Sequence, residues 1–244
     1  MCCFVDRCHS EAFLQVYQIK KRSLAGNVAI GFFVVAFVLI AVAFSTPSWL
    51  VSDYRITGAK LDRLGLWTHC FRSLSDPYSY DRAHHRFFVG CRWIYDPFTT
   101  GYDEIRGFLV PDFMVATQFF FTLCFISVLL GAVLTLIYFL CCGPDQKQHI
   151  TLITLNAWLL LAGGISGAIA VIVFAVLGNK NGWMPGHENN FFGWSFALAC
   201  IGVLASLVAA TLFFVDAYVQ RRKKKRMTES QSRFEMEPEQ HKGW

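Results

Sequence analysis

Gly65-Leu66-Trp67-Thr68-His69-Cys70 is the stretch of sequence that decides the fold, because of the segments that flank it. It lies between the first and the second of four long apolar segments that contain no charged residue. Trp49 precedes it and Cys91 follows it. We therefore expect a segment rich in tryptophan and cysteine that membrane helices hold at both ends. Such a protein acts through this segment and its membrane neighbours, and not through a soluble catalytic cleft.

The composition predicts a mainly α-helical membrane protein. Of the 244 residues, 55% are apolar and 16% are charged, against about 25% charged residues in a soluble domain. Each uncharged segment is longer than the roughly 20 residues with which a helix crosses about 30 Å of hydrocarbon. Backbone groups in lipid must be hydrogen-bonded internally, which favours helices, and the lack of alternating polarity argues against a β-barrel. The predicted spans are residues 27–47, 115–140, 152–177 and 193–215.

The basic residues predict the orientation in the membrane. Lys20-Lys21-Arg22 precede the first span, and a run of six basic residues, Arg221 to Arg226, follows the fourth. Because such residues favour the cytoplasmic side, we expect 1–26, 141–151 and 216–244 in the cytoplasm. Residues 48–112 and 178–192 are then extracellular. The tail from 216 is polar, and its composition predicts disorder. The net charge of +5 comes mostly from these clusters and indicates no nucleic-acid partner.

The first extracellular loop is predicted to form β-structure. Residues alternate in character from Leu64 to Phe71 and from Arg86 to Tyr95, with many aromatic and β-branched side chains, as in strands. Trp49 to Ile56 is a third candidate strand. So small a sheet has little core of its own, so we expect it to need a cross-link and a supporting surface.

Cys70 and Cys91 are the only cysteines in the predicted extracellular segments. In an oxidising compartment an isolated pair is best interpreted as a disulfide, although two free thiols remain the alternative. Closing this loop stabilises the folded state by roughly 3 kcal/mol.

Small residues at helical spacing predict close helix contacts in the membrane. They favour packing within one bundle over packing against another copy. The residues concerned are Gly163, Gly164, Gly167, Ser127 and Gly131.

Cys141 and Cys142 follow the second span directly and are candidates for S-palmitoylation, as are Cys2 and Cys3. His69, His84 and His85 invite a metal site, but no spacing brings three ligands to one point. We therefore predict neither a metal nor a cofactor. The sequence also contains no catalytic motif, so we do not expect an enzyme.

Trp49, Gly65-Leu66-Trp67, Cys70 and Cys91, in this order and topology, resemble the W–GLW–C–C signature of the claudin superfamily. The resemblance covers nearly the whole chain. It implies a left-handed four-helix transmembrane bundle with a small extracellular antiparallel sheet, in which Cys70 and Cys91 tie adjacent strands. It also implies that Trp49 and Trp67 hold the sheet on the bundle, which agrees with the preference of tryptophan for membrane interfaces.

Loop charges select ions in this family, and Arg92, directly after Cys91, is the charge we single out. The first loop has eight basic and eight acidic residues, however, so the balance predicts neither cation nor anion selectivity. Residues 72–86 look like an insertion between the two cysteines, and the chain ends in Gly243-Trp244. These departures favour a divergent, invertebrate-type claudin-like protein of septate junctions over a vertebrate tight-junction claudin.

The resemblance implies a structural protein of lateral cell–cell junctions in the plasma membrane. Its partners would be the lipid bilayer and other claudin-like or junctional proteins, including copies of itself, in cis and in trans. It would form or support a paracellular diffusion barrier. The alternative is an auxiliary subunit of an ion channel or receptor, similar to calcium-channel gamma subunits and AMPA-receptor regulatory proteins.

Overall fold

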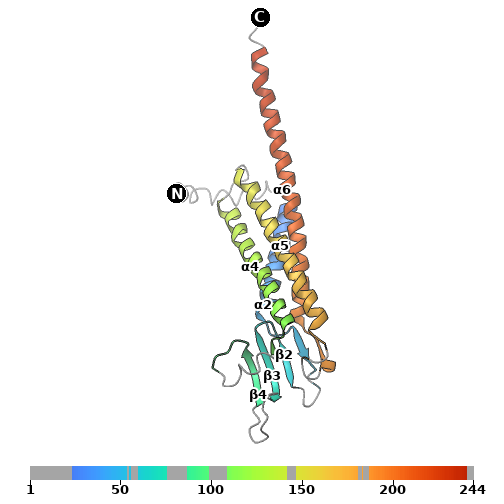
Figure 1. The fold of residues 1–244 in the computed structure, drawn as a ribbon. Coiled ribbons are helices and arrows are strands. Elements are labelled where there is room, and N and C mark those ends of the chain that lie inside the picture. The colour runs from blue at the N-terminus through green and yellow to red at the C-terminus, as the bar shows by residue number, and fades with distance from the viewer. Residues whose placement is uncertain are drawn as a thin grey trace.

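The computed structural model describes residues 24–53, 55, 60–75, 87–98, 109–141, 147–180, 183 and 187–240, which form a helical bundle with a β-sheet at one end (Figure 1). Four long helices in this part of the chain are apolar enough to cross a membrane. They are α2 (Leu24–Ser45), α4 (Asp112–Cys141), α5 (Lys147–Leu177) and α6 (Trp194–Gln240). The predicted four-span fold with a small antiparallel sheet is confirmed.

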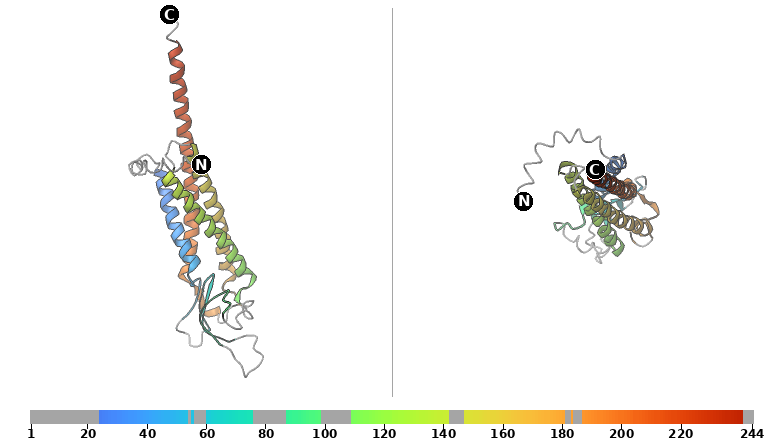
Figure 2. Two further views of the ribbon diagram at one scale, coloured as in Figure 1. Left: turned by 90° about the vertical axis from the view of Figure 1, so that its left-hand side faces the viewer. Right: turned by 90° about the horizontal axis from the view of Figure 1, so that it is seen from above.

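The four predicted spans each fall on one helix, and α6 continues well beyond the end of its predicted span. Helix α2 ends at Ser45, two residues before the predicted end. Pro47 explains the earlier end, because a proline disfavours the helical conformation of the residue before it, here Thr46. Helix α2, the first of the four, begins at the end of the bundle opposite the sheet. Helix α6, the last, leaves the bundle at the same end and projects beyond it (Figure 2).

Small residues bring the helices into close contact. A Cβ atom added to Gly163 of α5 would lie 2.8 Å from Cβ of Ser127 on α4, and one on Gly167 would also meet α4. A Cβ atom on Gly164 would lie 2.5 Å from Cδ2 of Leu207 on α6. Helix α5 therefore packs between α4 and α6, and these glycines make their contacts inside one chain.

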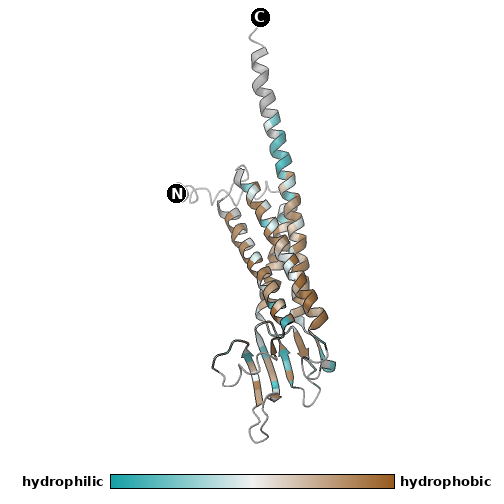
Figure 3. Ribbon diagram, in the orientation of Figure 1, coloured by the Kyte–Doolittle hydropathy of each residue, from teal (hydrophilic) through white to brown (hydrophobic). Residues whose placement is uncertain are grey.

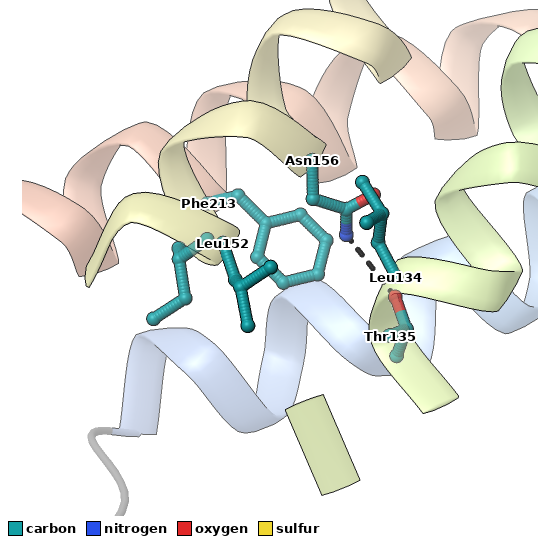
Figure 4. Close-up of a pocket in the computed structure, with 6 residues that line it drawn as sticks. Leu134, Thr135, Leu152, Asn156 and Phe213 are labelled. Carbon is teal, nitrogen blue, oxygen red and sulfur yellow. Dashed lines mark hydrogen bonds between the residues drawn. The ribbon is translucent and has the colours of Figure 1, made fainter. Parts of the chain in front are cut away.

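A polar contact joins α4 and α5 inside the apolar bundle (Figure 4). Asn156 Nδ2 donates to Thr135 Oγ1 at 3.1 Å, and Thr135 Oγ1 donates to the carbonyl oxygen of Gly131 at 2.8 Å. A Cβ atom on Gly131 would lie 2.9 Å from Asn156 Oδ1, so glycine leaves room for the amide. Asn156 and Thr135 line a cavity of about 10 Å³ together with Leu134, Leu152, Ile153 and Phe213.

The sheet in the described part of the chain has five strands in the order β4-β3-β2-β1-β5, and all neighbours are antiparallel. The strands are β1 (Leu50–Ser52), β2 (Leu61–Leu64), β3 (Thr68–Ser75), β4 (Phe87–Trp93) and β5 (Asn190–Phe192). Strand β5 follows a short 3-10 turn, η3 (His187–Asn189), in the second loop. The two loops thus build one sheet, with β4 and β5 at its two edges.

The prediction of a single strand from Leu64 to Phe71 is wrong. The structure divides this stretch into β2, a turn over residues 65–67, and β3. The Gly65 amide donates to the carbonyl oxygen of Thr68 at 2.9 Å and closes a hairpin. The alternation continues through the turn and therefore conceals it. The candidate strand Trp49–Ile56 is also shorter, since β1 covers Leu50–Ser52, whereas β4 matches the prediction for Arg86–Tyr95 closely.

The prediction of a disordered tail from residue 216 is also wrong, because α6 continues without a break to Gln240. This segment contains no glycine and is rich in Lys, Arg, Glu, Gln and Met, which are good helix formers. Lys225 Nζ also lies 3.9 Å from Glu229 Oε1, one turn along the helix. Figure 3 shows α6 changing from apolar within the bundle to hydrophilic beyond it.

Replacing Gly163 by alanine tests the close contact between α4 and α5. We expect a loss of about 1–3 kcal/mol, because the new methyl group overlaps Ser127 on a neighbouring helix. The matched control is Gly31→Ala in α2, where a Cβ atom meets nothing within 4 Å. This control should be neutral or slightly stabilising, by up to about 1 kcal/mol. Thermal unfolding of both variants in detergent micelles measures the difference, and equal midpoints would contradict the packing described.

Candidate functional site

The sheet and its attachment to the bundle form the candidate functional site. Cys70 and Cys91 face each other in the register of β3 and β4 and form a disulfide, with Cα atoms 3.9 Å apart. The bond joins residues 21 apart in the sequence and ties the edge strand β4 to the rest of the sheet. A sheet of this size needs such a cross-link because its own core is small.

Trp49 attaches the sheet to all four helices. Its side chain is fully buried, and Nε1 donates to the carbonyl oxygen of Ala43 on α2 at 2.8 Å. The indole also makes edge-on contacts with Phe121 of α4, Phe174 of α5 and Phe196 of α6, with ring centroids 5.0, 5.1 and 5.7 Å away. One residue directly before β1 thus fixes where the sheet lies relative to the bundle.

The turn formed by Gly65, Leu66 and Trp67 gives a second point of attachment. A Cβ atom on Gly65 would lie 2.5 Å from Cα of Pro47, so only glycine lets the turn approach the chain after α2. Leu66 is fully buried, and its carbonyl oxygen accepts a hydrogen bond of 2.7 Å from Gln118 Nε2 on α4. Trp67 lies in this turn, and not within a strand as expected. Its ring packs 5.4 Å from that of Phe44 at the end of α2.

Gly193 packs against the other side of the segment that connects α2 to β1. The Gly193 amide donates to the carbonyl oxygen of Trp49 at 2.9 Å, and a Cβ atom on Gly193 would overlap the carbonyl oxygen of Ser48. The connection between α2 and β1 therefore lies between Gly65 and Gly193, and no side chain fits at either position.

The sequence analysis did not predict which residues of the helices contact Trp49 and the turn at Gly65–Trp67. A lone amide, Gln118, in an apolar helix was a usable signal, since a buried polar group in a membrane needs a hydrogen-bond partner. Phe121, Phe174 and Phe196 carried no signal, because phenylalanine is abundant in all the spans.

The inward face of the sheet carries a buried histidine. His69 lies opposite Arg92 in the register of β3 and β4 and is fully buried. Neither of its ring nitrogens has a hydrogen-bond partner among the residues that the structure describes. Burial lowers the pKa of His69 to about 3, because a charged imidazolium loses its hydration there. His69 is therefore neutral at physiological pH.

Charges of opposite sign contact one another on the described part of the sheet. Asp62 contacts Arg63 at 3.1 Å and Arg72 at 3.3 Å, and Arg92 Nη1 lies 3.6 Å from Asp96 Oδ2. Arg92, the basic residue that the family resemblance singled out, is thus partly neutralised. The three arginines exceed the two aspartates by one charge, so these contacts leave a small positive excess.

The outward face of the edge strand β4 is apolar. Phe87, Val89 and Trp93 alternate along it and are 61%, 59% and 53% exposed. On the opposite edge, Phe191 of β5 is 53% exposed. Large side chains exposed together on a sheet face are unusual for a surface that only contacts water.

The remaining predicted residues are less informative. Cys141 is the last residue of α4, while Cys142, Cys2 and Cys3 lie outside the described residues. His84 and His85 lie outside them as well. Within the described part of the chain, no three His, Cys, Asp or Glu side chains gather as metal ligands.

Trp49→Phe tests the attachment of the sheet. The variant keeps an aromatic ring but leaves the carbonyl oxygen of Ala43 without its donor, and we expect a loss of about 1–3 kcal/mol. Trp93→Phe is the matched control, because Trp93 is half exposed and should change the stability little. Thermal unfolding in detergent distinguishes the two variants, and an unchanged midpoint for Trp49→Phe would show that the hydrogen bond contributes nothing.

Burial of His69 predicts a sensitivity to acid. The pKa of His69 is lower in the folded state than the ordinary value of 6.5, so the unfolded chain binds the proton more tightly. Stability should therefore fall as the pH drops below about 6.5, by about 2 kcal/mol at pH 5, and level off below about pH 3. His69→Leu should remove this part of the pH dependence. Unfolding midpoints between pH 7.5 and 5 measure it, and identical slopes for both proteins would contradict the assignment.

The comparisons with known proteins agree with this geometry. Residues 34–215 match the model of the family described as PMP-22/EMP/MP20/Claudin tight junction. The chain is also similar to Clc-like protein 2 of Caenorhabditis elegans, with 28% identity over 198 residues, which cover 78% of this chain and 73% of that protein. The matched region contains the second and third apolar helices, the second half of the first and most of the fourth, together with the disulfide, Trp49 and Trp67. The chain therefore belongs to the PMP-22/EMP/MP20/Claudin family.

Proposed function

We propose that this protein is a claudin-like component of cell–cell junctions of the septate or tight-junction type. Its sheet contacts other junctional membrane proteins, including copies of itself, in the same membrane and on the facing cell. These contacts restrict diffusion between cells. The single observation that carries the proposal is the apolar outward face of β4, formed by Phe87, Val89 and Trp93.

The distribution of charge supports an extracellular sheet. In the sequence, basic residues directly precede α2 and others follow the apolar part of α6. Helix α2 begins, and α6 leaves the bundle, at the end opposite the sheet (Figure 3). This pattern favours cytoplasmic termini. The disulfide between Cys70 and Cys91 fits an oxidising compartment on the other side. The protein is then a multi-pass protein of the plasma membrane.

Strand β4 is suited to contact another protein. It is the last strand in the order of the described sheet. Natural proteins protect such edges with charges, proline or covering segments, whereas β4 carries only Arg92 as a charge and no proline. An edge strand with an exposed apolar face is best explained by a partner that covers it.

The same surface favours a seal over an ion-conducting pore. A water-filled path that selects ions needs charged or polar groups that are free to face the ions. Here the outward face of β4 is apolar, and the nearby charges of Asp62 and Asp96 lie beside arginines. Apolar side chains buried between two proteins exclude water and the ions dissolved in it.

A triple variant in which serine replaces Phe87, Val89 and Trp93 tests the proposal. In epithelial cells that lack their own claudin-like proteins, the wild-type protein should lower the paracellular flux of a small tracer several-fold. The triple variant should reach the lateral membrane, because these side chains are exposed, but should not lower the flux. Tracer flux and surface labelling of the same monolayers measure both effects.

Phe98→Ser is the matched control, since Phe98 is 92% exposed but lies beyond the sheet. It should form the barrier like the wild type. A triple variant that also restricts the tracer normally would refute the role of β4. Stoichiometric co-purification with a channel, combined with an even surface distribution and no barrier, would instead support an auxiliary channel subunit.

A further inference from the structure

A ring of positive charge surrounds α6 where it leaves the bundle. Arg221 to Arg226 are six consecutive basic residues in a continuous helix. Successive residues of an α-helix are rotated by about 100°, so six of them distribute around the whole circumference with no gap wider than about 100°. The cations thus form a ring at one depth along the axis, and not a stripe on one face.

The depth of this ring corresponds to the headgroup layer of a bilayer. Trp194 and Tyr218 are 54% and 55% exposed and mark the two ends of the apolar part of α6, about 36 Å apart along the axis. Exposed Trp and Tyr side chains favour membrane interfaces, which enclose about 30 Å of hydrocarbon. The ring begins about 4.5 Å beyond Tyr218 and extends over about 7.5 Å.

The described contacts of Arg221, Arg222 and Lys225 neutralise little of the charge of these three side chains. Arg221 Nη2 donates to the neutral Thr154 Oγ1 at 3.2 Å, and the Arg222 guanidinium lies 4.8 Å from the ring centroid of Tyr218. Lys225 lies 3.9 Å from Glu229, but both side chains are mostly exposed, and such pairs contribute little. The ring therefore keeps a strong excess of positive charge.

We infer that Arg221 to Arg226 bind the headgroups of several anionic phospholipids arranged around α6. Lipids approach a membrane helix from all sides and place their phosphates at this depth, which matches a ring. An acidic peptide or a nucleic acid would approach from one side and would favour a charged face. Arginine binds phosphate oxygens in a bidentate manner and lysine adds charge, so the mixture suits phosphate groups. The inference does not depend on the junctional role or on the orientation of the protein.

The test uses the full-length protein in bilayer vesicles of phosphatidylcholine with a trace of spin-labelled phosphatidylserine or spin-labelled phosphatidylcholine. Electron paramagnetic resonance measures how strongly each label associates with the protein. We expect the wild type to prefer phosphatidylserine by at least about fivefold, which corresponds to the attraction of one basic residue near a charged membrane surface. Equal association of the two labels would overturn the inference and leave the basic run as a determinant of topology only.

Two variants that each neutralise half of the ring distinguish lipid from a one-sided partner. Arg221, Lys224 and Lys225 lie on one side of the helix, and Arg222, Lys223 and Arg226 lie on the other. Replacing the three residues of either set by glutamine should reduce the preference for phosphatidylserine to about twofold. The three remaining cations preserve the orientation of the protein in the membrane. Loss confined to one set would contradict a ring of lipids and indicate a protein or nucleic acid that docks on one face.

The charge-matched control places glutamine at Arg55, Lys60 and Arg63, which lie at the sheet end and are exposed. Its preference should equal that of the wild type, and an equal loss there would mean that only the total charge matters. Inorganic phosphate added at constant ionic strength should leave the preference intact. Removal of the preference by phosphate would show that the ring binds free phosphate and not the lipid headgroup.

Discussion

The Trp49 side chain joins the helical bundle to the sheet, beside the attachments at Gly65–Trp67 and Gly193. A membrane bundle gains no hydrophobic energy from helix association in lipid, and a sheet this small has almost no core. Trp49 contributes to both parts. Its indole contacts a residue of every helix, and its backbone amide donates to the carbonyl oxygen of Leu64 in β2 at 2.8 Å. Its carbonyl oxygen accepts the Gly193 amide before α6. The first and last spans and the sheet therefore share one rigid point, and Gly65 and Gly193 leave space for it.

This anchor lies far from the surface that we propose to be functional. Trp49 leads into β1, whose neighbours are β2 and β5, whereas β4 forms the opposite edge. Among the described strands, β4 pairs with β3, and the disulfide between Cys70 and Cys91 joins these two strands. Directly after β4, the Ile94 amide donates to the carbonyl oxygen of Trp67 at 3.0 Å. The strand that presents Phe87 and Trp93 is therefore tied both to its neighbour by the cross-link and to the turn that packs on the bundle.

The sequence predicted those parts of the structure that a single physical effect determines. The length of the uncharged segments predicted the membrane spans, because such a segment can cross lipid only as an internally hydrogen-bonded helix. The isolated cysteine pair predicted the disulfide. The predictions were wrong where a local sequence pattern and another physical effect favour different structures. The alternation around Gly65 continued through a turn that depends on tertiary contacts with Pro47 and Gln118. The polar tail after Asp216 lacks a hydrophobic face, which suggested disorder, but its helix propensity and the preceding span extend α6. Strand β5 has only three residues and owes its existence to its pairing with β1.

The two ends of the bundle differ in the kind of surface they offer, and this difference follows from where each charge can be solvated. At the sheet end, acidic and basic side chains lie beside one another, and the exposed face of β4 is apolar, so contact with a similar surface costs little desolvation. At the other end, Arg221 and Arg222 contact neutral groups, the hydroxyl of Thr154 and the ring of Tyr218. Burying six such cations against a protein would require an equal number of acidic groups, whereas a layer of phosphates supplies them without burial. The chain thus separates an apolar surface suited to proteins from a charged one suited to lipid headgroups, with the membrane between them.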